Sequence, residues 1–461
     1  MTELTQPIRS YIAAFERLEQ GLNGTSDSAI HQVRRNAIQR FAEMGFPTTR
    51  QEEWKYTSVA AIAGRSFTMA EVYQPGGLSG KEFERIERGL FGEPPDNRLV
   101  FVDGRHAADL SALGDLPAGV VVRSLADVLQ TDSGLVEGML GRYVGAEDHA
   151  FAVLNTAFAQ EGAVVQIPSG QVVEAPIHLL FISTGRADGV VSYPRVLVTA
   201  GESSQAALVE SYIGLGDAVS LTDAVVEVVL AENASIDHYK LQEESLAAYH
   251  VSMMHVHQER NSRFVSHSIS LGGALARNDV RVELGGEGIE TTLNGLYIAT
   301  GQQHVDNHTL IDHASPHCDS REVYHGILDG RARGVFNGKI LVRQDAQKTD
   351  ARQTNRNLLI SDTAQVDTKP QLEIFADDVK CTHGATVGQL DEESVFYLRS
   401  RGIDLENARG LLTYAFASEI VAGIKLESLR DHLEKLVFSR LSSGAGNANL
   451  LTGPSPLKET A

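Results

Sequence analysis

The feature that most constrains the fold is a long run of short β-branched segments, from about residue 100 to about residue 390. Clear examples lie at residues 164–167, 225–230 and 280–284, and Gly, Asn or Asp follows soon after each. No long segment of this region shows a convincing period of 3.6 residues. Short strands separated by turn residues are typical of a sandwich, a large barrel, a propeller or a β-helix.

Two observations within this region favour the β-helix. The turns lack the aromatic signature that recurs in each blade of a propeller, and similar short turns recur at 231–235 and 361–365. The repeat is imperfect. The pattern therefore predicts a mainly β core and favours, without requiring, a coiled architecture.

Helical patterns flank the β-rich region. Ile8, Tyr11 and Phe15 lie at helical spacing near the start, and Leu405, Ala408 and Leu412 do so near the end. We therefore predict an N-terminal helical domain with its connection at 1–100, a β core at 101–390 and a C-terminal helical domain at 391–461, with a disordered tail from Ser442. The apolar stripes of the C-terminal helices suit packing against the core or a groove for a partner.

The chain is acidic, with 40 Lys and Arg against 60 Asp and Glu, for a formal charge of −20. Such a charge repels phosphate backbones and anionic lipid, which argues against nucleic-acid and membrane-surface binding. The N-terminus lacks a signal-peptide pattern, and no apolar run approaches the roughly 18 residues of a membrane span. We expect a cytoplasmic protein whose two cysteines, Cys318 and Cys381, are reduced thiols.

A dense group of potential metal ligands lies in the second half of the β-rich region. It consists of His304, His308, His313 and His317, with Asp306, Asp312, Cys318 and Asp319 between or beside them. These residue types suit Zn or Fe, but the spacing matches no HExxH motif. A stand-alone metalloprotein and a hydrogen-bonded turn network therefore both remain open.

Motifs for catalysis are weak. The chain contains no G-x-x-x-x-G-K-[ST] loop, no G-x-S-x-G elbow and no protease-type sequence around either cysteine. A β-helix enzyme acting on polysaccharide, with the acidic residues between His304 and Asp319 as its site, is an alternative. Such enzymes are usually exported and expose aromatic platforms, whereas this chain has 6% aromatic residues. The sequence therefore offers no specific motif for ATPase activity or for nucleophilic catalysis.

Cys381 and His383, where the β-rich region ends, form one further pair of possible metal ligands. In a strand, alternate side chains share a face, so Cys381 and His383 would lie together with Cα atoms about 6.6 Å apart. A thiolate and an imidazole could then reach one centre. Taken alone, however, a Cys-x-His pattern is more often two unrelated residues.

Several motifs together identify a family. They are Gly45-Phe46-Pro47, EWKYT at 53–57, GVFNGK at 334–339 and ADDVKCTHGAT at 376–386. With these motifs the chain resembles the SufB/SufD family of iron-sulfur cluster assembly proteins, and the match to its SufD members is close. The resemblance covers nearly the whole chain and is most specific from about 320 to 420.

The resemblance implies a right-handed parallel β-helix flanked by N- and C-terminal α-helical domains. It also implies a scaffold that pairs with a SufB-like subunit through the end of the β-helix and binds a SufC-like ATPase through its C-terminal helices. A homodimer is a further possibility for the isolated chain. The ATPase activity would reside in the SufC-like partner.

The resemblance maps His383, and behind it Cys381, onto ligands of a nascent cluster at the SufB interface. An iron-sulfur cluster usually takes four ligands, mostly thiolates, whereas this chain has two cysteines. We therefore expect no stably bound cofactor in the chain alone and a transient iron-sulfur cluster in the complex.

Overall fold

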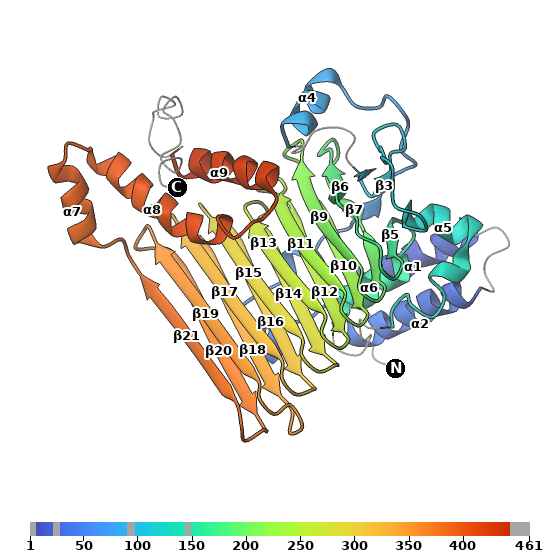
Figure 1. The fold of residues 1–461 in the computed structure, drawn as a ribbon. Coiled ribbons are helices and arrows are strands. Elements are labelled where there is room, and N and C mark those ends of the chain that lie inside the picture. Colours follow the sequence, from blue (N-terminus) through green and yellow to red (C-terminus); the bar gives the residue numbers. More distant parts are fainter. Residues whose placement is uncertain (1–5, 22–27, 90–96, 143–148, 443–461) are drawn as a thin grey trace.

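The core of the molecule is a parallel β-solenoid of about 8 turns made from two sheets (Figure 1). The computed structural model describes residues 6–21, 28–89, 97–142 and 149–442. The larger sheet has 11 strands: the path β20-β18-β16-β14-β12-β10-β8-β5-β4, with β7 beside β10 and β1 beside β7. The smaller sheet has 10 strands, in the order β21-β19-β17-β15-β13-β11-β9-β6-β2-β3. From β8 onward successive strands alternate between the sheets, and the expected mainly β fold with a parallel β-helix is confirmed.

The strands lengthen along the chain. The early strands are β1 (Thr68–Met69), β2 (Asn97–Val102), β3 (Arg105–His106), β4 (Val121–Ser124), β5 (Gly162–Ile167), β6 (Ile177–Ser183), β7 (Val190–Ser192) and β8 (Arg195–Ala200). The longer strands are β9 (Gln205–Gly214), β10 (Ser220–Leu230), β11 (Ser235–Glu243), β12 (Tyr249–Gln258), β13 (Arg263–Ser270), β14 (Leu275–Leu284), β15 (Glu290–Ala299), β16 (His304–His313), β17 (Asp319–Leu328), β18 (Arg333–Val342), β19 (Asp350–Leu359), β20 (Gln365–Ile374) and β21 (Lys380–Gly388).

In-register stacking explains how the β-branched segments become a solenoid. Leu275 lies beside His304, which lies beside Arg333, so each turn repeats the same strand position. Alternate residues of each strand face the interior, where apolar side chains such as Val282, Ile311 and Phe336 form a continuous core. The division of the chain into domains at residues 100 and 390 stays a prediction.

A helical layer covers the early part of the larger sheet. It is built from α1 (Gln6–Gly21), α2 (Ala29–Met44), α3 (Ala60–Ala63) and α6 (Ala150–Phe158), while η1 (Glu52–Trp54), α4 (Gly80–Gly89), α5 (Leu125–Thr131) and η2 (Ser133–Leu135) lie on the connections. The helix α6 lies within the β-rich region, where the sequence shows no helical period. All nine of its residues are buried, including Asn155 and Thr156, so it has no solvent-exposed polar face to produce an amphipathic pattern.

The C-terminal helices are α7 (Glu392–Ser400), α8 (Leu405–Val421) and α9 (Glu427–Ser442). Apolar residues of α8 and α9, such as Ile420 and Leu433, pack against Ile269 and Leu296 on the outer face of the smaller sheet. The disordered tail was predicted from Ser442, but Ser442 ends α9, and residues 443–461 lie outside the described residues. Within the described part of the chain, no helix is long and apolar enough to span a membrane.

A buried charge network joins the EWKYT segment to the larger sheet. The guanidinium of Arg277 lies 3.7 Å from the centre of the Trp54 ring and donates to the Glu53 carbonyl at 2.8 Å. It also pairs with Asp306 at 2.7 Å, and Thr57 Oγ1 donates to the same carboxylate at 2.5 Å. Fully buried ion pairs on the larger sheet therefore hold the EWKYT segment in place, and Trp54 is one contact of this network.

His308 completes this network and gives it a pH dependence. Burial disfavours the His308 cation, but the Asp306 carboxylate, 3.0 Å away, together with hydrogen bonds to Asp306 and Glu53, raises the pKa of His308 to about 9. A raised histidine pKa contributes stability that is fully present below the ordinary value of 6.5 and is lost as the pH passes 9.

We expect His308→Ala to lower the free energy of unfolding at pH 6 by about 3 kcal/mol, because it removes one member of a buried ion pair. The difference from the wild type should shrink steadily as the pH is raised to 9.5. Urea denaturation of both proteins across this range measures it. A difference that stays constant with pH would show that His308 is not charged in the network.

Candidate metal-ligand site

The last turn of the solenoid is open. β21 pairs with β19 and β20 pairs with β18, and in the described ranges no further strand covers either one (Figure 1). Every residue of β21 is exposed except Cys381, which is half-buried. The backbone groups along the outer edge of both strands are therefore available to another chain.

Register places Cys381 and His383 at the interior side of this open turn. Cys381 lies beside Ala351 and His383 beside Gln353, and both of these β19 residues are buried inside the solenoid. Cys381 packs against the interior cluster that contains Ala351. The two side chains thus share a face, as strand alternation predicts, while their role as metal ligands stays a prediction.

The local environment keeps the Cys381 thiol protonated. Burial raises the pKa of Cys381 above its ordinary value, and the Asp350 carboxylate adds to this effect. A metal that binds this sulfur has to displace the proton. Iron binding at this sulfur would therefore release a proton and depend on pH.

The histidine group of the sequence does not form one centre. His304 shares a hydrogen bond of 2.9 Å with Thr57 on the outer face, whereas His313 shares one of 2.9 Å with Ser320 inside the solenoid. His317 lies exposed in a turn, and Cys318 is buried, with its thiol donating to the Gly286 carbonyl at 3.3 Å. Across 6–21, 28–89, 97–142 and 149–442, no three His, Cys, Asp or Glu side chains are arranged to hold a metal ion.

Sequence reasoning missed a polar column inside the last turns. Glu322 on β17 lies beside Gln353 on β19, and Gln353 lies beside His383 on β21. The amide Nε2 of Gln353 donates to Glu322 Oε2 at 2.6 Å, and both side chains are fully enclosed. The sequence did indicate interior polar residues, because β19 carries polar residues on both faces. Local periodicity, however, does not reveal which of these residues align with His383.

The GVFNGK motif shapes the space around this column. Gly338 on β18 faces the interior opposite Gln353, and a Cβ at Gly338 would collide with the amide nitrogen of Gln353 and with the ring of Phe336. The second glycine of the motif thus leaves room for the Gln353 amide. This gives a physical reason for a glycine in the middle of a strand, where it otherwise weakens packing.

Glu322 should make stability depend on pH. Burial raises its pKa from 4.5 to about 7, so the folded chain favours the protonated carboxyl and loses stability as the pH rises between these values. We expect Glu322→Gln, which keeps an acceptor for Gln353, to be more stable than the wild type at pH 8 by about 3 kcal/mol. The two proteins should match near pH 5. Urea denaturation at both pH values tests this, and a less stable variant at pH 8 would contradict it.

Comparison with known proteins agrees with these features. A family model described as the SufBD core domain of the SUF system for FeS cluster assembly matches residues 181–416, and the SufBD N-terminal region matches residues 5–179. A SufBD family iron-sulfur cluster assembly protein of Synechocystis is 34% identical over 427 residues, covering 91% of this chain and 93% of that protein.

Two relatives carry a more specific name. The iron-sulfur cluster assembly protein SufD of Escherichia coli is 34% identical over 411 residues, which cover 88% of this chain and 92% of that protein. SufD of Bacillus subtilis is 27% identical over 355 residues, or 75% of this chain and 79% of that protein. The chain therefore belongs to the SufBD family of iron-sulfur cluster assembly proteins and is a homologue of SufD.

Proposed function

We propose that this chain is a non-catalytic scaffold subunit that acts in the cytoplasm and presents one half of a cluster assembly site. Its open solenoid end pairs with a SufB-like subunit, and His383 supplies a ligand to an iron-sulfur cluster that is cargo of the complex. The observation that carries this proposal is the exposed position of His383 on β21, whose outer edge no strand covers in the described residues.

The terminal turn has the character of an interface. Long, flat edge strands with free backbone groups are templates for pairing with another chain. Exposed apolar residues accompany this edge, since Val387 is 48% exposed, Ile374 is 40% exposed and Phe375 is 63% exposed. A second solenoid docked against this end would continue both sheets and cover these side chains. In the absence of a SufB-like subunit, a second copy of this chain fits the same edge as a homodimer.

The donor set supports a shared site. Cys381 and His383 supply two donors at most, whereas an iron-sulfur cluster takes four, so the partner must provide the remainder. A neutral imidazole binds iron but is released on protonation. A ligand of this kind suits a cluster that has to be transferred onward.

We expect His383→Ala to reduce cluster formation at least tenfold in a complex co-purified with SufB-like and SufC-like proteins, because it removes a ligand without disturbing the core. Cys381→Ala should have a smaller effect. Cluster formation is measured by visible absorption and by iron and sulfide content, after the subunit ratio has been verified.

The matched control for this experiment is His317→Asn, which alters another exposed histidine and suits the left-handed backbone at φ +58°. This variant should assemble clusters like the wild type. Undiminished assembly in His383→Ala, with the complex intact, would remove His383 from the proposed site.

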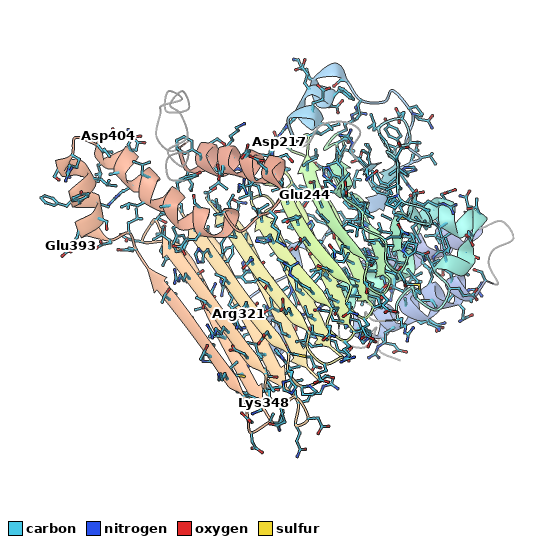
Figure 2. The ribbon with its side chains drawn as sticks, in the orientation of Figure 1. Asp217, Glu244, Arg321, Lys348, Glu393 and Asp404 are labelled. Atoms are coloured by element: carbon cyan, nitrogen blue, oxygen red, sulfur yellow. The ribbon has the colours of Figure 1, made fainter. Side chains whose placement is uncertain are left out.

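A second surface suits the ATPase partner. On α7, Phe396 is 72% exposed and Tyr397 is 56% exposed, and Leu411 on α8 is 41% exposed. The rim carries both charges: Glu392 and Glu393 lie in the first turn of α7, while Arg399 lies in its last turn. Figure 2 labels Glu393 on α7 and Asp404 at the start of α8. An exposed apolar patch with a charged rim is typical of a protein–protein interface. We assign this surface to the SufC-like ATPase.

We expect Phe396→Asp to weaken capture of the SufC-like protein at least tenfold, because it places a charge in the apolar centre of the patch. Removing α8 and α9 is a poorer test, since their buried residues pack on the smaller sheet. Affinity is measured by calorimetry or surface plasmon resonance. The control is Phe83→Asp, on α4, where the phenylalanine is 44% exposed; equal binding by both variants would move the interface elsewhere.

A further inference from the structure

We propose that Gln353 is a positioning residue for His383: its amide oxygen accepts a hydrogen bond from one ring N–H, so that the other ring nitrogen faces out of the open solenoid end. Glu322 holds the amide in the required orientation. The inference deepens the proposed function and rests on it only for the ligand role of His383. The position and tautomer of the ring can be tested without a cluster.

The Gln353 amide has a hydrogen-bond partner for its nitrogen but not for its oxygen among the described residues. Its Nε2 donates to Glu322 Oε2 at 2.6 Å, whereas its Oε1 is buried and has no hydrogen-bond partner among the described residues. An unsatisfied buried acceptor costs about 1–3 kcal/mol, so a nearby donor is strongly favoured. On the side away from Glu322, the neighbouring side chain in register is His383.

The spacing suits this contact. Adjacent strands lie about 4.8 Å apart, and side chains in register on the same face project side by side. An imidazole N–H on β21 can therefore reach the amide oxygen on β19 through an ordinary rotation of the ring. Because no strand covers β21 in the described part of the chain, the opposite ring nitrogen remains accessible from outside.

Two neighbours fix the orientation of the amide. At pH 8, above the pKa of about 7 that burial gives Glu322, its carboxylate has acceptor oxygens alone, so the NH₂ group of Gln353 has to face it and the carbonyl has to face β21. Gly338 and Phe336 enclose the NH₂ group from the opposite sheet, where even a Cβ at Gly338 would collide with it. Interior packing thus sets the donor and acceptor pattern that reaches His383.

The chemical consequence concerns the tautomer of the ring. In a neutral histidine, one nitrogen carries a proton and the other has the lone pair that binds a metal, and a hydrogen bond at the first determines which is which. With the amide oxygen as acceptor, the protonated nitrogen faces inward and the lone pair faces the interface. Without it, both tautomers are populated and the ring reorients freely.

The test uses the full chain labelled with ¹⁵N-histidine, with the His383 signals assigned by their absence in His383→Ala. At a pH where the ring is neutral, long-range ¹H–¹⁵N correlation spectra report the tautomer ratio of His383. We expect the wild type to favour one tautomer by about tenfold, as one hydrogen bond predicts. Gln353→Leu, of similar size, should give a nearly even mixture.

Two substitutions at Glu322 provide the matched comparison, since neither alters Gln353 or His383. Glu322→Leu removes the acceptor and lets the amide rotate, so the His383 tautomers should mix. Glu322→Gln keeps an acceptor and should preserve the wild-type ratio. Equal tautomer ratios in these two variants would overturn the role of Glu322. If Gln353→Leu fails to fold, a ratio in Glu322→Leu unchanged from the wild type overturns the proposal.

The outcomes separate this inference from the proposed function. A wild-type tautomer ratio in folded Gln353→Leu overturns the positioning role even if His383→Ala abolishes cluster formation. A mixed ratio in Gln353→Leu supports positioning even if His383→Ala assembles clusters normally, in which case the ligand role of His383 fails. If both roles hold, Gln353→Leu should slow cluster formation less than His383→Ala does.

Discussion

The structure depends on one constraint, the in-register stacking of parallel strands. Each turn satisfies its backbone groups with the turn before and the turn after, so stability extends along the coil but leaves the last turn unsatisfied. The backbone groups at the terminal edge of such a chain need hydrogen-bond partners, from water or from another chain. The placement of His383 on that edge follows from the same rule, because β21 is the last strand of its sheet.

Stacking also arranges polar residues into columns inside the solenoid. Lys240 donates to Asn278 at 2.7 Å, and Asn278 donates to Asn307 at 3.2 Å on the next turn. Near the open end, Gln353 likewise donates a hydrogen bond to Glu322 on the preceding turn. Buried polar groups are stabilised where neighbouring turns supply partners, and near the open end Gln353 Oε1 has none among the described residues. Register places His383 beside Gln353 on the terminal strand.

Much of the fold could be predicted from local sequence. Period-two strands, turn residues and amphipathic end helices correctly indicated the β core and its flanking helices, and alternation placed Cys381 and His383 on one face. The helix α6 was not predicted because it is short and buried on all sides. The network of Trp54 and Arg277 was not predicted because its members lie far apart in the sequence. Glu53 and Arg277, for example, are 224 residues apart, and no local pattern connects them.

The sequence by itself determined the elements, the family and the pair of candidate ligands, because these depend on short-range spacing and on motifs. The tertiary structure alone decided which residues stand beside one another. Glu322 and Gln353 are 31 residues apart, and their alignment depends on the lengths of the intervening turns. A change of one residue in a strand's register would turn its interior side chains outward. For this reason the column beneath His383, and the separation of the histidine group onto two faces, emerged only from the folded chain.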